Sequence, residues 1–271
     1  MRGQRLMRKL AVAVLFSVTI GALLAPRIAP YSYDEQFRDA PNAAPGGRFP
    51  MGTDDIGRDR LSRLLYGTRV SILLAPAAAF VSIVLALLIS IPGASRFPTL
   101  APAVSGLTTI CLSLPWLFLF IILRAKLPLN TAPATSVLLT FALMGVAGFA
   151  WPARVFTASI REIRQSGWIL QARAAGMRSR RILMVHGWPH LRSIALAQFR
   201  ILVPAYIISE ASLGLLGLGV ADPLPSWGNL IQDLQRPDVV RANPWVLAPL
   251  ALLILVMMCL ESLQSERETP L

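Results

Sequence analysis

The sequence predicts an all-α integral membrane protein with six membrane-spanning helices. Its 271 residues are 55% hydrophobic and only 15% charged, whereas soluble domains carry about 25% charged residues. The apolar residues gather in runs long enough for a bilayer, which needs about 20 residues per helix. The 26 Lys and Arg residues outnumber the 14 Asp and Glu residues. Because these charges lie between the apolar runs, membrane topology explains them better than nucleic-acid binding.

Six apolar segments define the predicted spans. The first, in residues 1–30, joins a basic N-terminus to the apolar run Leu10–Ala25. It could be a cleaved secretory signal, but the spans that follow favour an uncleaved helix. The other five form a predicted core over residues 70–260, at Val70–Gly93, Leu100–Leu123, Ala134–Phe156, Ile194–Val220 and Val246–Leu260.

The segment between the first two spans, residues 31–69, is predicted to be extracytoplasmic and mostly irregular. Prolines and glycines interrupt its first half, and such residues punctuate regular structure. Its last part, Asp54–Tyr66, is predicted to form a short amphipathic helix at the membrane surface. Asp54, Asp55, Arg58, Asp59 and Arg63 make it densely charged, either as a solvated network or as a docking region.

The distribution of basic residues sets the predicted orientation. Seven arginines and one glutamate, Glu162, lie in Thr157–Ser193, whereas Ala221–Trp245 holds two arginines and three aspartates. Lys and Arg favour the cytoplasmic side. In this orientation Arg124 and Lys126 would lie on the outer side, against the rule, but the Thr157–Ser193 loop holds more basic residues and therefore sets the orientation. Both termini, including the tail at residues 261–271, are therefore predicted to be cytoplasmic.

The basic loop Thr157–Ser193 has its own helical pattern. Apolar residues recur at helical spacing opposite arginines, and Gly176 interrupts the run at its centre. The pattern predicts two amphipathic helices that meet at this glycine. They would either dock a cytoplasmic partner or lie in the lipid interface.

Four motifs, in order, resemble those of the ABC importer permeases that serve dipeptides, oligopeptides and nickel. The loop reads LQARAAG over Leu170–Gly176, and nine residues then lead to HGWP over His186–Pro189. The stretch Met51–Ile72 reads MGTDDIGRDRLSRLLYGTRVSI. Ser209–Val220 reads SEASLGLLGLGV, and Pro223–Asn229 reads PLPSWGN. The proline-rich tract and the first helix resemble the second permease of such systems, the DppC and OppC type.

The resemblance implies a type I permease fold with a cytoplasmic coupling helix. It implies an importer subunit that forms the translocation pathway for peptides or a related small solute. The implied partners are a homologous permease, two cytoplasmic ATPase subunits, an extracytoplasmic solute-binding protein and the lipid bilayer of a bacterial inner membrane. ATP and Mg²⁺ would be bound by the ATPase subunits and no cofactor by this chain, because it has no phosphate-binding glycine loop and no catalytic constellation.

The resemblance also assigns roles to individual residues. The positions implied to contact the ATPase are Leu170, Gln171, Ala172, Gly176, His186 and Pro189. The positions of the extracytoplasmic motif are Gly52, Thr53, Asp54, Gly57, Arg58, Asp59, Ser62 and Arg63. Leu170 stands where the family signature has a glutamate. That departure leaves open an alternative, a membrane scaffold or assembly protein that keeps the fold without pumping.

Glu210 is the acidic residue of the Ile194–Val220 span. Acids within a bilayer are costly and tend to face a cavity or a partner. Glu210 is therefore predicted in the pathway or a gate, in a structural hydrogen bond or ion pair with Arg154 or Arg200 as candidates, or at the membrane interface. Gly214 and Gly217 follow, for close helix packing or a flexible gate.

Two further expectations concern aromatic and metal-binding residues. Trp227 and Trp245 fit an aromatic belt at the outer interface. His186 and His190 lie four residues apart but have Pro189 between them and no acidic neighbour, so no metal site is predicted.

Overall fold

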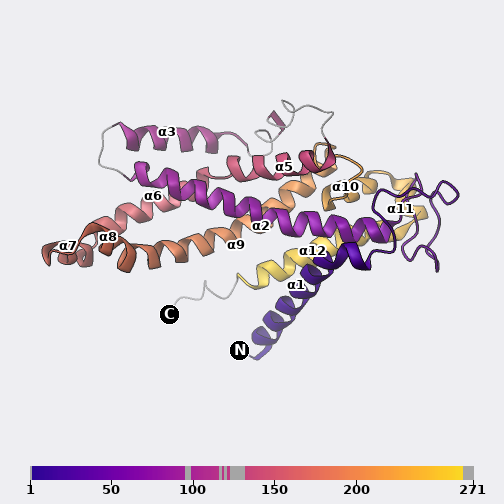
Figure 1. Ribbon diagram of the computed structural model, residues 1–271, viewed down its shortest axis with the longest axis horizontal. Coiled ribbons are helices and arrows are strands. Elements are labelled where there is room, and N and C mark those ends of the chain that lie inside the picture. The colour runs from indigo at the N-terminus through magenta and orange to yellow at the C-terminus, as the bar shows by residue number, and fades with distance from the viewer. Residues whose placement is uncertain (1, 95–98, 116–117, 119–120, 123–131, 265–271) are drawn as a thin grey trace. The chain divides into compact units, whose positions relative to one another are not determined.

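The computed structural model describes residues 2–94, 99–115, 118, 121–122 and 132–264. In these ranges the chain is helical, with an isolated bridge between Thr53 and Asp59. Figure 1 shows the order of the helices. The chain divides into two compact units, and α2, α5 and α9 each contribute to both.

Within the described residues, five helical segments are long and apolar enough to cross a membrane: Arg5–Ile28, Arg60–Gly93, Pro133–Gln165, Trp188–Leu215 and Pro244–Ser262. They correspond to five of the six predicted spans. The remaining span, predicted at Leu100–Leu123, contains the shorter apolar helix α3, Leu100–Ser113. Residues 116–117, 119–120 and 123 of that prediction lie outside the described part of the chain.

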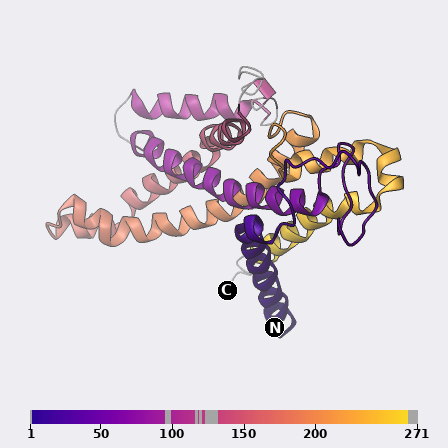
Figure 2. The same ribbon diagram turned by 45° about the vertical axis from the view of Figure 1, so that its right-hand side comes forward.

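The first unit comprises residues 1–75, 127–140 and 204–271. Helix α1, Arg2–Ile28, packs against α12, Ala248–Ser262, and both lie side by side in Figures 1 and 2. The unit also holds the start of α2 and the end of α9. Its short elements are α10 at Trp227–Ile231, a 3₁₀ turn at Gln232–Gln235, α11 at Pro237–Ala242 and a second 3₁₀ turn at Pro244–Leu247.

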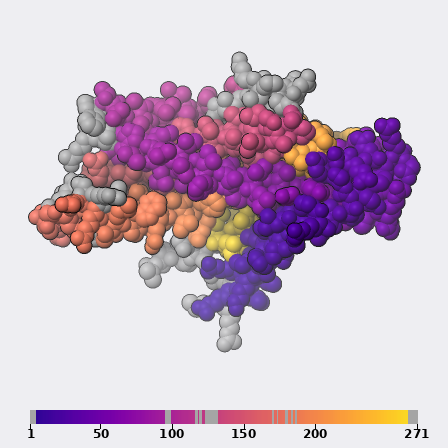
Figure 3. All heavy atoms as spheres, in the orientation of Figure 1, coloured from indigo at the N-terminus to yellow at the C-terminus, as the bar shows by residue number. Residues whose placement is uncertain are grey.

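The segment between α1 and α2 has no helix or named strand. Figure 3 shows its atoms close together, in indigo. Tyr31, Phe37 and Phe49 stack in an aromatic cluster with ring centroids 4.7–5.5 Å apart. The Arg48 guanidinium lies 4.9 Å from the Phe37 and Phe49 ring centroids and donates to Asp39. That hydrogen bond lowers the pKa of the Asp39 carboxyl.

The predicted surface helix at Asp54–Tyr66 is wrong. Residues 54–58 form turns, and α2 begins at Arg60 and continues unbroken to Gly93. The carboxylate of Asp59 accepts the Ser62 backbone N–H at 2.8 Å and the Ser62 hydroxyl at 2.6 Å. Such a side-chain bond satisfies a free N–H of the first helical turn. The charged residues therefore start a spanning helix instead of forming a separate one.

The second unit comprises residues 76–126 and 141–203. The end of helix α5, Pro133–Ala147, belongs to this unit. It is followed after a two-residue turn by α6, Ala150–Gln165, which packs against α3. Helix α6 thus extends beyond the predicted end of the fourth span at Phe156. Its Arg161 and Arg164 donate to the backbone oxygens of Gly93 and Ala94, at 2.7 Å each. Guanidinium groups at this position satisfy carbonyls at the end of α2 and complement its dipole.

The basic loop forms the short helices α7, Gly167–Ala174, and α8, Ser179–Ile182. A π-helical turn at Leu183–Gly187 leads into α9, Trp188–Leu215. This span begins six residues earlier and ends five residues earlier than the predicted Ile194–Val220. The predicted break at Gly176 is present in the structure.

Candidate functional site

Two glycine turns organise the extracytoplasmic motif. Gly52 and Gly57 have φ values of +68° and +84°, a region that favours glycine. A Cβ on Gly57 would lie 2.1 Å from the Phe37 carbonyl oxygen, and one on Gly52 would lie 2.3 Å from that of Ala43. Neither position has room for a larger residue, so the motif's glycines hold the irregular segment in place.

Thr53 closes the same turn. Its hydroxyl donates to the Ala40 carbonyl at 2.5 Å and accepts the Ala43 N–H at 2.8 Å. Ser62 likewise accepts the Tyr31 N–H at 3.1 Å. Both hydroxyls tie the chain after α1 to the start of α2. Much of the motif thus builds the local fold.

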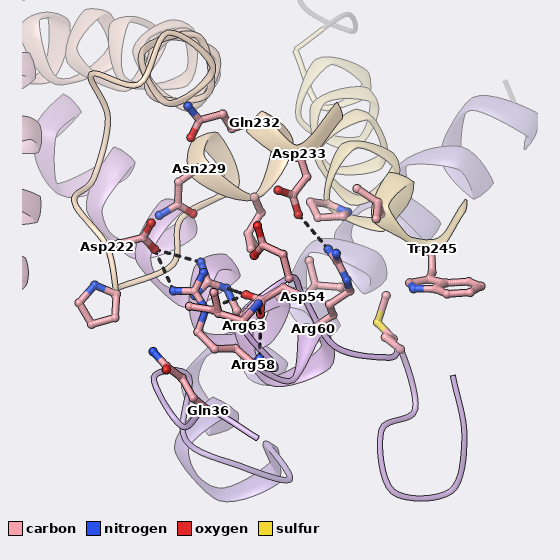
Figure 4. A pocket seen from close by; sticks show the side chains of 18 residues that line it. Gln36, Asp54, Arg58, Arg60, Arg63, Asp222, Asn229, Gln232, Asp233 and Trp245 are labelled. Atoms are coloured by element: carbon pink, nitrogen blue, oxygen red, sulfur yellow. Dashed lines mark hydrogen bonds and ion pairs between the residues drawn. The ribbon is translucent and has the colours of Figure 1, made fainter. Parts of the chain in front are cut away.

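The charged residues of the motif meet acids from a distant part of the chain. We call Asp54, Arg58, Arg60, Arg63, Asp222 and Asp233 the charged cluster, shown in Figure 4. Arg58 Nε lies 2.6 Å from Asp54 Oδ2, and Asp222 Oδ1 lies 3.3 Å from Arg58 and 3.2 Å from Arg63. Arg60 pairs with Asp233 at 2.9 Å. The cluster therefore joins the start of α2 to the segment after α9.

Burial contradicts the solvated network for part of these charges, whereas the docking interpretation stays a prediction. Asp54, Asp59 and Arg63 are each about 95% or more buried, whereas the Asp222 side chain is 65% exposed. A solvated surface network is therefore wrong for the core of the cluster. Removing one member of a buried ion pair leaves an uncompensated charge and is strongly destabilising, so the cluster fixes local structure.

The charged cluster lines a cavity of about 630 Å³. Its wall also includes Trp245 and apolar side chains such as Ile56 and Leu64. A cavity of this size, with mixed polar and apolar walls, is in the range of ligand and docking pockets. Sequence reasoning missed Arg60, Asp222 and Asp233 as members. Arg60 lies inside the quoted motif and Asp222 next to PLPSWGN, so proximity to the motifs was the available signal.

Glu210 is fully buried on α9 in the first unit. Its Oε2 accepts a hydrogen bond from the Ser71 hydroxyl of α2 at 3.1 Å. The same Ser71 oxygen accepts the Trp227 backbone N–H at 3.1 Å. Arg154, one predicted partner, belongs to the second unit and donates to Thr109 instead. The structure thus supports the hydrogen-bonded contact for Glu210.

Trp227 differs from its predicted place in an aromatic belt. It is 0% exposed, and its indole N–H donates to the Thr68 hydroxyl of α2 at 3.0 Å. The Ser226 hydroxyl and the Asn229 side chain cap α10 reciprocally. Trp227 therefore anchors α10 to α2. Trp245 is partly buried and lines the cavity with the charged cluster.

The two predicted gate glycines have different structural roles. A Cβ on Gly214 would lie 2.2 Å from the carbonyl carbon of Gly228, so α9 and α10 touch backbone to backbone there. Gly217 lies beyond the end of α9 with φ +72°. The Leu218 N–H bonds to the Leu213 carbonyl at 2.8 Å, as in a Schellman cap. Close packing holds for Gly214, whereas Gly217 terminates the helix.

The predicted coupling residues extend from α7 to the start of α9. Leu170, Gln171 and Ala172 lie on α7, His186 lies in the π-helical turn, and Pro189 is the second residue of α9. The Ala172 side chain is buried and that of Gln171 is exposed. The side chains of Leu170 and His186 lie outside the described part of the structure, so their predicted contacts stay predictions.

Gly176 produces the bend between α7 and α8. Its φ is +77°, and the Met177 N–H bonds to the Ala172 carbonyl at 3.0 Å. This is again the Schellman pattern, in which glycine occupies the left-handed position. A Cβ on Gly176 would meet no atom within 4 Å. Beside it, Met177, Arg178, Arg181 and Met184 line an open hollow of about 640 Å³.

The comparisons with known proteins agree with this fold. Residues 78–265 match the family described as "Binding-protein-dependent transport system inner membrane component". The chain belongs to this family. It is a permease subunit of a binding-protein-dependent importer and not an enzyme, and the scaffold alternative is not favoured.

Two relatives and one solved structure illustrate the similarity. The Pseudomonas aeruginosa di/tripeptide transport system permease protein DppC is 30% identical over 87% of this permease and 77% of the relative. The Escherichia coli oligopeptide transport system permease protein OppC is 29% identical over 92% and 81%, respectively. A chain of the MetNI methionine ABC transporter in an inward-facing conformation matches with TM-score 0.53 and 18% identity, over 76% of this permease and 96% of that chain. The last match shows the type I permease fold alone.

Proposed function

We propose that this permease is the second permease subunit of a peptide importer. Support comes from its relatives' names, which specify dipeptide and oligopeptide transport. In the proposed assembly it pairs with a homologous permease and two cytoplasmic ATPase subunits that bind ATP and Mg²⁺. An extracytoplasmic binding protein delivers the peptide. Both termini lie in the cytoplasm of a bacterial cell, because the Lys and Arg bias favours that orientation.

The helix pair α7 and α8 is the proposed ATPase contact, and the bend at Gly176 is the observation that carries this assignment. The bend brings small residues, Ala175 and Gly176, to an exposed surface beside the guanidinium groups of Arg178 and Arg181. Small residues allow close approach of a partner, and exposed arginines can pair with its carboxylates. The contact can therefore form although Leu170 replaces the signature glutamate.

The cavity lined by the charged cluster is the proposed docking region for the binding protein. Its residues come from the segment before α2, the first turns of α2, the segment after α9 and the start of α12, all at the extracytoplasmic side in the proposed orientation. Glu210 and Gly214 lie within the last turns of α9. They support the extracytoplasmic end of the translocation pathway by fixing α10 against α2 and α9.

Reconstitution tests the proposed function. The chain is co-expressed with its genomic neighbours that encode a permease, ATPases and a binding protein, and the complex is placed in liposomes. ATP-dependent uptake of a labelled dipeptide, stimulated by the binding protein, is expected. Failure of the chain to associate with any ATPase, or ATP-independent uptake, would refute the proposal.

Matched glycine variants test the coupling surface. Gly176→Leu forces a side chain into the left-handed conformation, which costs about 1–2 kcal/mol, and it fills the exposed bend. We expect ATP hydrolysis without proportional peptide uptake. Gly21→Leu is the control, because Gly21 lies on α1, outside the proposed contact, has no left-handed φ, and a Cβ there would also meet no atom within 4 Å. Equal uptake by both variants would remove Gly176 from the coupling contact.

A further inference from the structure

A second cavity, in the other unit, is lined by residues of α3 and α6. Its volume is about 280 Å³. Its wall consists of small and hydroxyl side chains together with two arginines, namely Ala101, Val104, Ser105, Thr108, Arg154, Thr157, Ala158 and Arg161. The permease function described above uses none of these residues.

Both arginines are exposed and lie on the same face of α6. Arg154 and Arg161 are seven residues apart, which is about two helical turns and about 10 Å. Arg154 Nη2 donates to the Thr109 hydroxyl at 2.5 Å, and Arg161 Nη2 donates to the Gly93 carbonyl at 2.7 Å. Both acceptors are neutral. In the described part of the chain neither arginine forms an ion pair with a carboxylate.

Unneutralised guanidinium groups at this position need an explanation. Arg154 lies in the apolar helical segment Pro133–Gln165, and a charged side chain within a bilayer is costly unless it meets a partner or water. Beside the two guanidinium groups, the cavity is lined by hydroxyl side chains. The Thr157 hydroxyl is buried without a hydrogen-bond partner, and Ser105 is exposed. The site therefore offers several hydrogen-bond donors and a double positive charge.

The surroundings of the cavity are apolar and exposed. On α3, Leu107 is 47% exposed and Ile110 is 66% exposed, and on α6 Trp151 is 56% exposed. Exposed side chains of this kind suit hydrocarbon chains, and tryptophan favours the membrane interface. A free anion in solution would gain nothing from them, whereas a lipid would use the arginines and the apolar flank together.

We propose that this cavity binds the phosphate of an anionic phospholipid headgroup, with the acyl chains along the exposed side of α3. Arginine suits phosphate because its planar guanidinium can donate two parallel hydrogen bonds. Basic pockets between membrane helices bind anionic lipid headgroups on the same physical grounds. The site is independent of the peptide and of the ATPase.

Native mass spectrometry of the full chain, released from nanodiscs that contain phosphatidylglycerol and phosphatidylcholine, tests the site. We expect preferential retention of one phosphatidylglycerol molecule. Arg154→Gln should lower that retention about fivefold, because each basic residue near an anionic surface contributes a factor of this order. Arg154→Lys should retain an intermediate amount. Arg161 is left intact, because its bond to Gly93 also supports the end of α2.

Arg192→Gln is the matched control, since it removes the same charge from an exposed position of the same unit on α9. It should leave retention unchanged, and unchanged melting temperatures should show that both variants fold. Equal retention of the two lipids, or equal losses in the Arg154 and Arg192 variants, would overturn the proposal. A second experiment adds inorganic phosphate to the protein in nanodiscs that contain only phosphatidylcholine. If the ³¹P resonance of the phosphate broadens with the parent but not with Arg154→Gln, the site takes a free anion, and the proposal is overturned.

Discussion

Replacing Gly214 by alanine adds one methyl group at the point where α9 and α10 are closest. The added Cβ would lie 2.2 Å from the Gly228 carbonyl carbon and 2.3 Å from its Cα. Ordinary carbon contacts are about 3.5–4.0 Å. Because the neighbour is backbone, no side chain can rotate away, and the two helices must separate by about 1.5 Å to reach an ordinary contact.

The expected loss follows from two opposing effects. Overpacking costs about 1–3 kcal/mol, and the rigid neighbour places Gly214→Ala toward the upper end. Alanine in a helix regains about 0.5–1 kcal/mol relative to glycine. The net destabilisation is about 2 kcal/mol, which corresponds to a fall in melting temperature of roughly 4–8 °C for a chain of this size.

Thermal unfolding in nanodiscs, followed by the fluorescence of a thiol-reactive dye or by circular dichroism, measures this change. Gly21→Ala is the control, because Gly21 lies in α1 of the same unit and its Cβ would meet nothing within 4 Å. The control should be as stable as the parent or slightly more stable. A Gly214→Ala variant that melts with the control would refute the backbone contact between α9 and α10.

Three further substitutions test other contacts. Asp59→Ala removes the side-chain cap of α2 and should destabilise the protein by about 1 kcal/mol or more; chemical denaturation should show no loss if the cap is absent. Thr68→Val leaves the buried indole N–H of Trp227 without an acceptor and should cost about 1–3 kcal/mol, and Trp227→Phe in the same chain should recover part of that loss. Arg48→Gln should raise the pKa of the Asp39 carboxyl toward 3.8. In the parent, the ionised Asp39 stabilises the fold above pH 3.8, and this stability is lost as the pH falls through the lower pKa of the folded state. The variant should lack this contribution. An NMR titration of Asp39 that gives the same pKa in both proteins would contradict this assignment.

Five of the six spans and the bend at Gly176 could be predicted because local patterns determine them. Apolar runs of about 20 residues need a bilayer whatever their neighbours are, and a glycine within a helical pattern often terminates a helix. The boundaries were less predictable. The charged residues before α2 suggested a separate helix, but Asp59 caps α2 directly, and α6 continues past Phe156 because its arginines reach the end of α2.

The long-range contacts could not be predicted from local patterns. Asp222 joins Arg58 and Arg63 across more than 150 residues of sequence, and nothing in its own surroundings indicates that choice. Trp227 matched an interfacial residue by composition, yet it is fully buried and its indole N–H donates to a hydroxyl on α2. Such pairings depend on how the helices pack, which periodicity does not encode.

The contact among Ser71, Glu210 and Trp227 has a consequence for how the protein is made. Ribosomes synthesise the N-terminal part first, so α2 emerges well before α9 and α10. When Glu210 enters the membrane, which opposes charged residues by about 2.5–3.5 kcal/mol, the Ser71 hydroxyl is already present as its partner. Trp227 is synthesised last and donates to Ser71 and Thr68. The order of synthesis thus makes the Ser71 and Thr68 hydroxyls available before Glu210 and Trp227 have to leave water.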